Sequence, residues 1–148
     1  MKPDLFLRIA SALTLLHAVL HTIGGVFGKP VPGPGEIAIL AMKTNPFKVM
    51  GLNRSYWDFY HGSGLAISVF LLAEAIVFWQ LGSLASTSAG SLRPILATFL
   101  LGYLGLAVVS YKYFFAPPVI TEVFIALCIG LAIVTSGSAV AGGRLPAR

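Results

Sequence analysis

The chain has 148 residues, of which 57% are hydrophobic and only 10% are charged, and its net charge is +5 at neutral pH. Because a soluble domain carries about 25% charged residues, this deficit excludes an ordinary globular domain with a merely apolar core. The ten Lys and Arg residues are scattered along the chain. Scattered cations indicate contact with anionic lipid headgroups and exclude a nucleic-acid site, which needs them gathered on one face.

Four apolar stretches predict four membrane-spanning helices, at about residues 9–27, 57–81, 94–115 and 118–137. Their apolar cores are each close to the ~20 residues that a helix needs to cross a hydrocarbon layer of roughly 30 Å, and these cores carry one formal charge, that of Glu74. Backbone groups in lipid must be satisfied within the chain, so the stretches are helices rather than open strands. We therefore expect an all-α fold and a single integral membrane domain over residues 1–148.

The first stretch carries a face of small and polar residues. Spacings of three and four place the following residues on one side of a helix: Ala10, Thr14, His17, His21, Gly24 and Gly28. Such a face packs against other helices, because small residues permit close approach and polar residues find partners there. His17 and His21 are thus predicted to face the protein interior, about 6 Å apart along the helix axis.

The connection after the first stretch is expected to be a short interfacial helical loop. Three prolines end the first helix, and residues 36–43 predict a short helix whose apolar face contains Ile37, Leu40 and Ala41. Asn45-Pro46 is then expected to cap one more helical turn, residues 47–50, closed by Gly51. Pieces of this kind lie at the membrane surface.

The start of the second helix has a capping-box pattern, Ser55-Tyr-Trp-Asp58. In such a box the hydroxyl bonds an amide three residues on, while the acidic side chain reaches back. The helix is therefore predicted to begin near Tyr56, which places Tyr56, Trp57 and Tyr60 in an aromatic belt at the headgroup level.

The two later connections are short. Residues 82–91 predict a tight loop, after which Ser91 caps the third helix with Pro94 in its first turn; Ala116-Pro117-Pro118 starts the fourth. Short connections make neighbouring helices antiparallel, so we expect an up-down-up-down four-helix bundle. Lys and Arg are divided five to five between the two sides, so the charge bias does not set the orientation. We favour cytoplasmic termini on base rate.

A cluster of polar residues is expected on the side of the first loop. His21, Asp58 and His61 are predicted at one membrane depth, with Glu122 at the start of the fourth helix on the same side. Three alternatives follow. His17, His21 and His61 could bind a transition metal, two histidines on facing helices could bind haem, or a histidine beside a carboxylate could relay a proton. Alternatively, the histidines only fix packing, and this interpretation predicts no cofactor.

Glu74 lies near the middle of the second helix. An ionised group there costs about 3 kcal/mol on translocon scales, so Glu74 should face the bundle interior or water, or stay protonated. One interpretation is a substrate or proton site, and the other is a protonated carboxyl bonded across helices.

Several motifs resemble those of a bacterial family of small four-helix integral membrane proteins without an assigned activity. They are His21-Thr-x-Gly-Gly25, Arg54-Ser-Tyr-Trp-Asp-Phe-Tyr60 with Gly62-x-Gly64, Ile67-Ser-Val-Phe-Leu-Leu72 and Tyr113-Phe-Phe-Ala-Pro-Pro118. The resemblance covers nearly the whole chain and implies a place in the bacterial inner membrane. In that family the position of His61 is often aromatic, which favours His21, Trp57, Asp58 and Tyr60 as the residues that share a role.

The function expected from the sequence is binding rather than catalysis. We expect a multi-pass inner-membrane protein that contacts the lipid bilayer and binds a protein partner or a lipid-like ligand near the first loop. The alternatives are a small histidine-based metal or haem redox protein, and a membrane enzyme that uses His21 and Glu74 on a lipid-like substrate.

Overall fold

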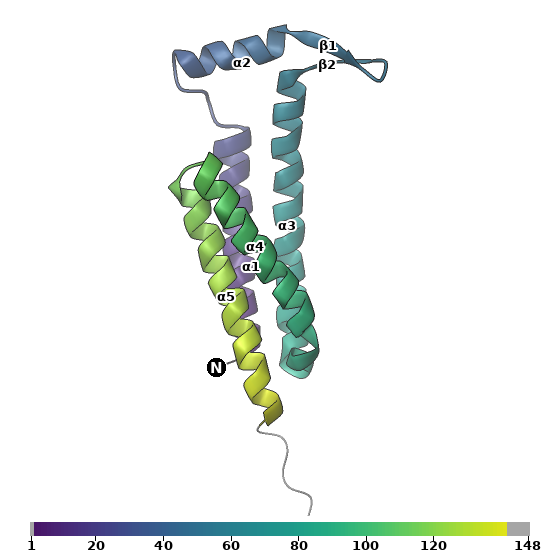
Figure 1. The fold of residues 1–148 in the computed structure, drawn as a ribbon, viewed down its shortest axis with the longest axis vertical. Helices are drawn as coiled ribbons and strands as arrows, with labels where there is room; N and C mark the ends of the chain where they lie inside the picture. The colour runs from purple at the N-terminus through teal and green to yellow at the C-terminus, as the bar shows by residue number, and fades with distance from the viewer. Residues whose placement is uncertain (1, 142–148) are drawn as a thin grey trace, which may run out of the picture. The chain divides into compact units, whose positions relative to one another are not determined.

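The computed structural model describes residues 2–141, with side chains described as far as Ser136. Its elements in chain order are α1 (Pro3–Leu20), the π-helix η1 (His21–Val26), α2 (Pro34–Thr44), β1 (Pro46–Val49), β2 (Leu52–Ser55), α3 (Tyr56–Ser88), the 3-10 helix η2 (Ala89–Leu92), α4 (Arg93–Tyr113) and α5 (Ala116–Ala141) (Figure 1). The predicted predominance of helix is confirmed. The basic residues Arg144 and Arg148 lie outside the described residues.

The chain divides into two compact units. Unit 1 consists of Met1–His17 and Leu72–Arg148, and unit 2 consists of Ala18–Leu71. The helices α1 and α3 therefore each contribute residues to both units. Unit 1 also contains α4 and α5, whereas unit 2 contains η1, α2 and the β-hairpin.

Three predicted helix starts agree with the structure. The helix α3 begins at Tyr56, Pro94 lies in the first turn of α4, and α5 begins at Ala116. The first helix begins earlier than expected, at Pro3, where a proline is favoured because its missing N–H has no partner in the first turn of a helix.

The prediction of a loop over residues 82–91 is wrong for residues 82–88, because α3 continues to Ser88. Gly82 is buried, and a Cβ atom there would lie 3.4 Å from Arg8 Cγ and 3.5 Å from Leu7 Cβ on α1. This close contact between helices outweighs the low helix propensity of glycine. Ser91 does not cap α4: its hydroxyl donates to the Ser88 carbonyl at 2.8 Å, and the residue before α4 is Leu92.

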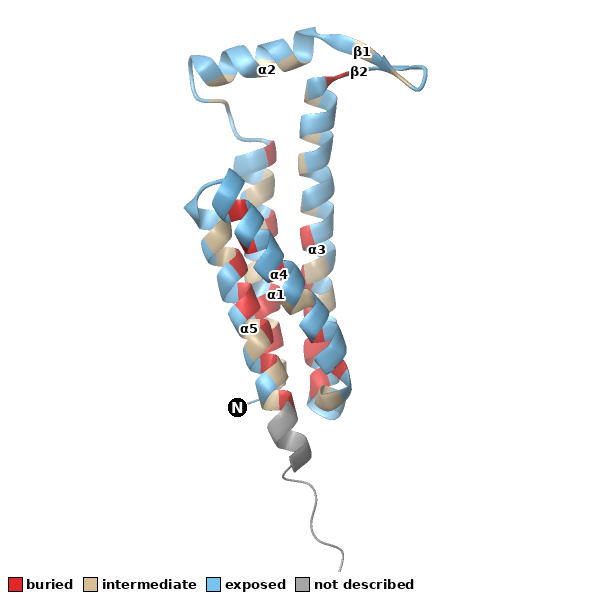
Figure 2. Cartoon of the chain, in the orientation of Figure 1, coloured by how far each residue is buried: buried red, intermediate tan, exposed pale blue. Residues whose placement is uncertain are grey.

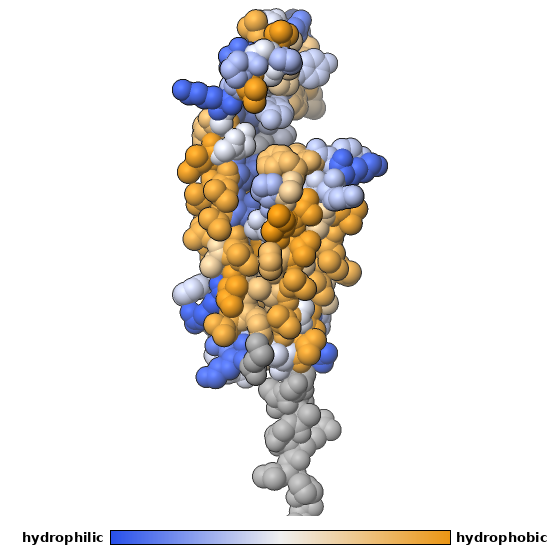
Figure 3. All heavy atoms as spheres, turned by 90° about the vertical axis from the view of Figure 1, so that its left-hand side faces the viewer, coloured by the Kyte–Doolittle hydropathy of each residue, from blue (hydrophilic) through white to orange (hydrophobic). Residues whose placement is uncertain are grey.

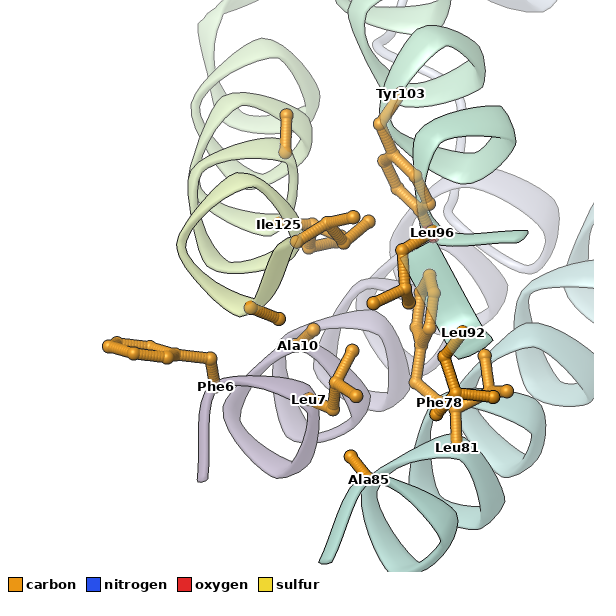
Figure 4. Close-up of a cluster of buried hydrophobic side chains, with 13 residues drawn as sticks. Phe6, Leu7, Ala10, Phe78, Leu81, Ala85, Leu92, Leu96, Tyr103 and Ile125 are labelled. Atoms are coloured by element: carbon orange, nitrogen blue, oxygen red, sulfur yellow. The ribbon is translucent and has the colours of Figure 1, made fainter. Parts of the chain in front are cut away.

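Unit 1 has a hydrophobic core to which all of its long helices contribute. Leu7 on α1, Phe78 on α3, Leu96 on α4 and Ile125 on α5 are each fully buried (Figure 4). The Phe78 ring meets the Phe99 ring edge-on, with centroids 5.0 Å apart, a favourable geometry for aromatic pairs. The core therefore fixes how these four helices pack within the unit.

The outside of unit 1 is also apolar. The face in Figure 3 shows apolar side chains over most of the helices of this unit, with hydrophilic ones toward its ends. Leu101, Val108 and Val134 are each about 70% exposed, at 71%, 68% and 69%. Three helical stretches of the described chain are long and apolar enough to cross a membrane, namely Pro3–Val26, Tyr56–Tyr113 and Ala116–Ser136. The second stretch contains both α3 and α4.

The connection between α1 and α3 is only partly the helical loop that the sequence predicts. Its helix is present as α2, but residues 46–55 form an antiparallel hairpin instead of a helical turn, with Phe47 opposite Arg54 and Val49 opposite Leu52. The two residues of the turn both have positive φ, 49° at Met50 and 84° at Gly51. This is the conformation of the tightest hairpin turns, and Gly51 adopts it without strain. In Figure 1 the helix α2 and the hairpin lie across the end of α3.

None of the residues of α2 is buried (Figure 2). The predicted apolar face of this helix is its exposed face: Ile37 is 69% and Leu40 is 61% exposed, and Ala41 is exposed too. On the hairpin, Phe47, Val49, Leu52 and Arg54 share one side of the ribbon, while Lys48 and Asn53 share the other. Both elements of this connection therefore expose apolar side chains beside cations.

Replacing Met50 by Asn should strengthen the hairpin. A left-handed backbone costs an L-residue other than Gly, Asn or Asp about 1–2 kcal/mol, and Asn-Gly is a preferred pair in this turn. Met50 is 99% exposed, so no packing is lost. We expect hydrogen exchange of the hairpin amides to slow by about fivefold, for about 1 kcal/mol gained. Leu52→Asn, at an exposed strand position without positive φ, is the control and should not slow exchange. Unchanged or faster exchange in Met50→Asn would contradict this account of the turn.

Candidate functional site

Four side chains of unit 2 form a layered stack at the start of α3. Trp57 stacks on His61 with ring centroids 5.3 Å apart and an interplanar angle of 18°. The Lys43 Nζ atom lies 4.5 Å from the Trp57 ring centroid, and Phe27 meets His61 edge-on at 5.8 Å. The stack thereby links α2, α3 and Phe27, the residue that directly follows η1. A cation over an indole face contributes about 0.5–1 kcal/mol at an exposed site.

His61 has a buried nitrogen inside this stack. Its Nδ1 atom is buried and has no hydrogen-bond partner within the part of the chain that the structure describes. A ring held between two aromatic side chains is fixed in orientation, so His61 has a packing role.

His21 begins η1 and joins it to α3. Its Nε2 atom lies 3.1 Å from the Gly64 carbonyl oxygen. Because a carbonyl oxygen only accepts, this bond places the imidazole hydrogen on Nε2. One residue further, the Thr22 hydroxyl contacts the Ala18 carbonyl at 2.7 Å and the Ser68 hydroxyl at 2.8 Å. His21, a member of the predicted small and polar face, thus finds a partner on α3. Gly24 and Gly28 of that face are exposed, so the prediction fails for them.

Glycine is required on α3 opposite these residues. A Cβ atom at Gly64 would lie 3.1 Å from Val26 Cγ2, closer than ordinary van der Waals contact. The Gly62-x-Gly64 motif therefore has one glycine that permits helix contact and one, Gly62, with open space around it. The π-helical turn over His21–Val26 was not predicted; such turns occur often at functional sites, and here it carries His21.

Asp58 has a structural role. The Ser55 backbone amide donates to Asp58 Oδ2 at 2.7 Å and the Ser55 hydroxyl donates to the same oxygen at 3.0 Å. In return the Asp58 amide donates to the Ser55 hydroxyl at 3.3 Å. The predicted capping box is confirmed. Tyr60 is 58% exposed and contacts Trp57, with ring centroids 5.7 Å apart.

The two candidate carboxyls of unit 1 are both in polar contact across helices. The Tyr103 hydroxyl on α4 donates to Glu74 Oε2 on α3 at 2.8 Å and lies 3.4 Å from Thr14 Oγ1 on α1. The Ser110 hydroxyl on α4 donates to Glu122 Oε1 on α5 at 2.9 Å. Tyr103 and Glu122 are 1% and 4% exposed. Glu74 therefore contacts a neighbouring helix within this unit, which is one of the alternatives that the sequence leaves open for it.

The predicted site residues are therefore distributed over two groups. Unit 2 brings together His21, Trp57, Asp58, Tyr60 and His61, whereas unit 1 holds His17, Glu74 and Glu122. His17 is half-buried on α1. Among residues 2–136, no three His, Cys, Asp or Glu side chains gather as metal ligands would.

Two polar partners were missed by sequence reasoning, Tyr103 and Ser110. Both lie on the largely apolar helix α4, and the available signal was that a polar group on such a helix needs a partner on a neighbouring helix. Comparison of the chain with protein-family models, with curated proteins and with solved structures found no match. The site therefore rests on its geometry.

The two glycines of α3 give a matched test of the contact between η1 and α3. Gly64→Ala should destabilise the protein by about 1–2 kcal/mol, because the new methyl group overpacks against Val26. Gly62→Ala meets open space and should be neutral or stabilising by up to about 1 kcal/mol through helix propensity. Thermal unfolding in detergent measures both. Equal stability of the two variants would contradict the close contact at Gly64.

Proposed function

We propose that this chain is a multi-pass protein of the bacterial inner membrane, with four helices that cross the bilayer in alternating directions and a first connection that binds lipid headgroups. Four crossings are supported by the length of α4. Its 21 residues extend about 31 Å, enough to cross the hydrocarbon layer. The tight η2 turn before it and the two-residue connection after it favour antiparallel neighbours.

The apolar exterior of unit 1 supports the same proposal. Contiguous exposed apolar surface is rare on soluble monomers, and lipid is the solvent in which such surface is stable. The hydrophilic side chains toward the ends of this unit (Figure 3) match the two headgroup layers.

The observation that carries the binding role is the exposed amphipathic connection in unit 2. An amphipathic helix of this kind lies in the interface with its apolar face toward the acyl chains, and the exposed face of Ile37, Leu40 and Ala41 fits that position. Lys43, Lys48 and Arg54 are exposed on the same two elements. Near an anionic membrane surface each such cation contributes about 1 kcal/mol.

The proposed ligand is therefore an anionic phospholipid headgroup. Cations beside apolar side chains match the chemistry of a phosphate attached to acyl chains. Lys43 is held over Trp57, and Trp57 thus reports directly on what approaches this surface.

Trp57 provides the test. In a Trp79→Phe background Trp57 is the single tryptophan of the chain. After reconstitution, phosphatidylglycerol with brominated chains should quench its fluorescence more strongly than equally brominated phosphatidylcholine at the same mole fraction. The triple variant Lys43→Ala, Lys48→Ala, Arg54→Ala should lose that preference.

Lys112→Ala is the control for this measurement, because Lys112 is exposed but lies over the Tyr113 ring of unit 1, 5.2 Å from its centroid. This variant should keep the preference of the parent protein. Equal quenching by the two lipids in the parent protein would overturn the headgroup-binding role.

A further inference from the structure

We propose that unit 1 contains a proton-binding site within its helices, formed by the carboxyl of Glu74, which the Tyr103 hydroxyl contacts, and the carboxyl of Glu122. Tyr103 is part of the buried core of this unit (Figure 4). Its hydroxyl contacts Thr14 and Glu74, and both Glu74 and Glu122 lie close enough to interact with it electrostatically. Side chains of α1 and α3 therefore contact this phenol of α4 directly, and Glu122 on α5 lies near enough to act on it electrostatically.

The hydrogens along this chain of contacts can be counted. The Thr14 hydroxyl donates to the Ala10 carbonyl at 2.9 Å, the oxygens of Thr14 and Tyr103 are 3.4 Å apart, and the Tyr103 hydroxyl lies 2.8 Å from Glu74 Oε2. Two hydroxyls supply two hydrogens for three contacts. With an ionised Glu74, the long contact between Thr14 and Tyr103 contains no hydrogen.

A proton on Glu74 completes the chain. Glu74 then donates to the Tyr103 oxygen, Tyr103 donates to Thr14, and Thr14 keeps its bond to the Ala10 carbonyl. All three contacts become hydrogen bonds, and no charge remains on Glu74. In the protonated arrangement no contact of the chain lacks a hydrogen, and that geometry defines the proton-binding position at Glu74.

Glu122 provides the independent second observation. Its side chain is 4% exposed, Ser110 donates to Oε1, and Oε2 is buried without a hydrogen-bond partner in the described part of the chain. A carboxylate oxygen in that position lacks a donor. Binding a proton at Oε2 removes the charge, so the two carboxyls are both placed to take up protons.

The other titratable and charged groups of unit 1 on these helices are Asp4, Arg8 and His17 on α1, Arg93, Tyr111, Lys112 and Tyr113 on α4, and Cys128 on α5. The cations Arg8 and Lys112 lie over the rings of Trp79 and Tyr113. A proton is also the one cation that needs no cavity of its own. The ligand class of this site is therefore the proton rather than a metal ion or an amine.

Infrared spectroscopy of the full-length protein in lipid nanodiscs tests the proposal. The carbonyl stretch of a protonated carboxylic acid should be present at pH 7 and should shift in heavy water. Glu74→Gln and Glu122→Gln should each remove about half of the band, and the double variant should remove it. Gln at position 74 can still donate to the Tyr103 oxygen, so the fold should be preserved. Glu36→Gln, on the exposed surface of α2, is the matched control and should leave the band unchanged.

The absence of a protonated carboxyl band from the wild-type spectrum at pH 7 would overturn the proposal. A band that persists in the double variant would also overturn it. In Tyr103→Phe, Glu74 loses its acceptor, so the band should move to higher frequency; an unmoved band would also contradict the site. None of these results depends on lipid headgroup binding at unit 2.

Discussion

Several polar groups on these apolar helices find their partners on a neighbouring helix, and these contacts define which helix faces pack together within each unit. Ser11 on α1 donates to the Ala75 carbonyl on α3 at 2.7 Å. Thr22 and Ser68, and Ser110 and Glu122, form equivalent contacts between helices. A buried hydroxyl or carboxyl with its partner on another helix, as at Ser11, Ser110 and Glu122, favours the helix face that packs inward. The apolar side chains alone leave that choice open, because these helices are apolar all round.

The predictions from sequence were right where a local motif determines the start of a helix. The capping box at Ser55 and Asp58 set the start of α3, and the prolines after Ala116 set the start of α5. They were wrong where packing between residues far apart in the sequence determines the structure. Gly82 looks like a helix terminator, but its contact with Leu7 continues α3. The hairpin was missed because a turn with Met at a positive φ is rare, so that residues 47–50 resembled a helical turn.

The sequence predicted which residue types belong to the candidate site, but not which of these residues lie together in space. His21 and His61 are both in unit 2, yet each has its own role, one bonded to Gly64 and the other stacked on Trp57. His17 belongs to unit 1 with the two carboxyls. Spacing along one helix predicts which residues share a face, whereas partners on other helices depend on register between helices. For that reason Tyr103, the residue at the centre of the polar contacts of unit 1, was missed.

The most direct test of the central claim, four membrane crossings with the first and second connections on opposite sides, is cysteine accessibility. In a Cys128→Ser background, single cysteines replace Lys43 on α2, Ser86 near the end of α3 and Phe115 between α4 and α5, all of them exposed positions. A membrane-impermeant thiol reagent is applied to oriented vesicles from each side. We predict that positions 43 and 115 react from one side and position 86 from the other. Labelling of positions 43 and 86 from the same side would contradict the account.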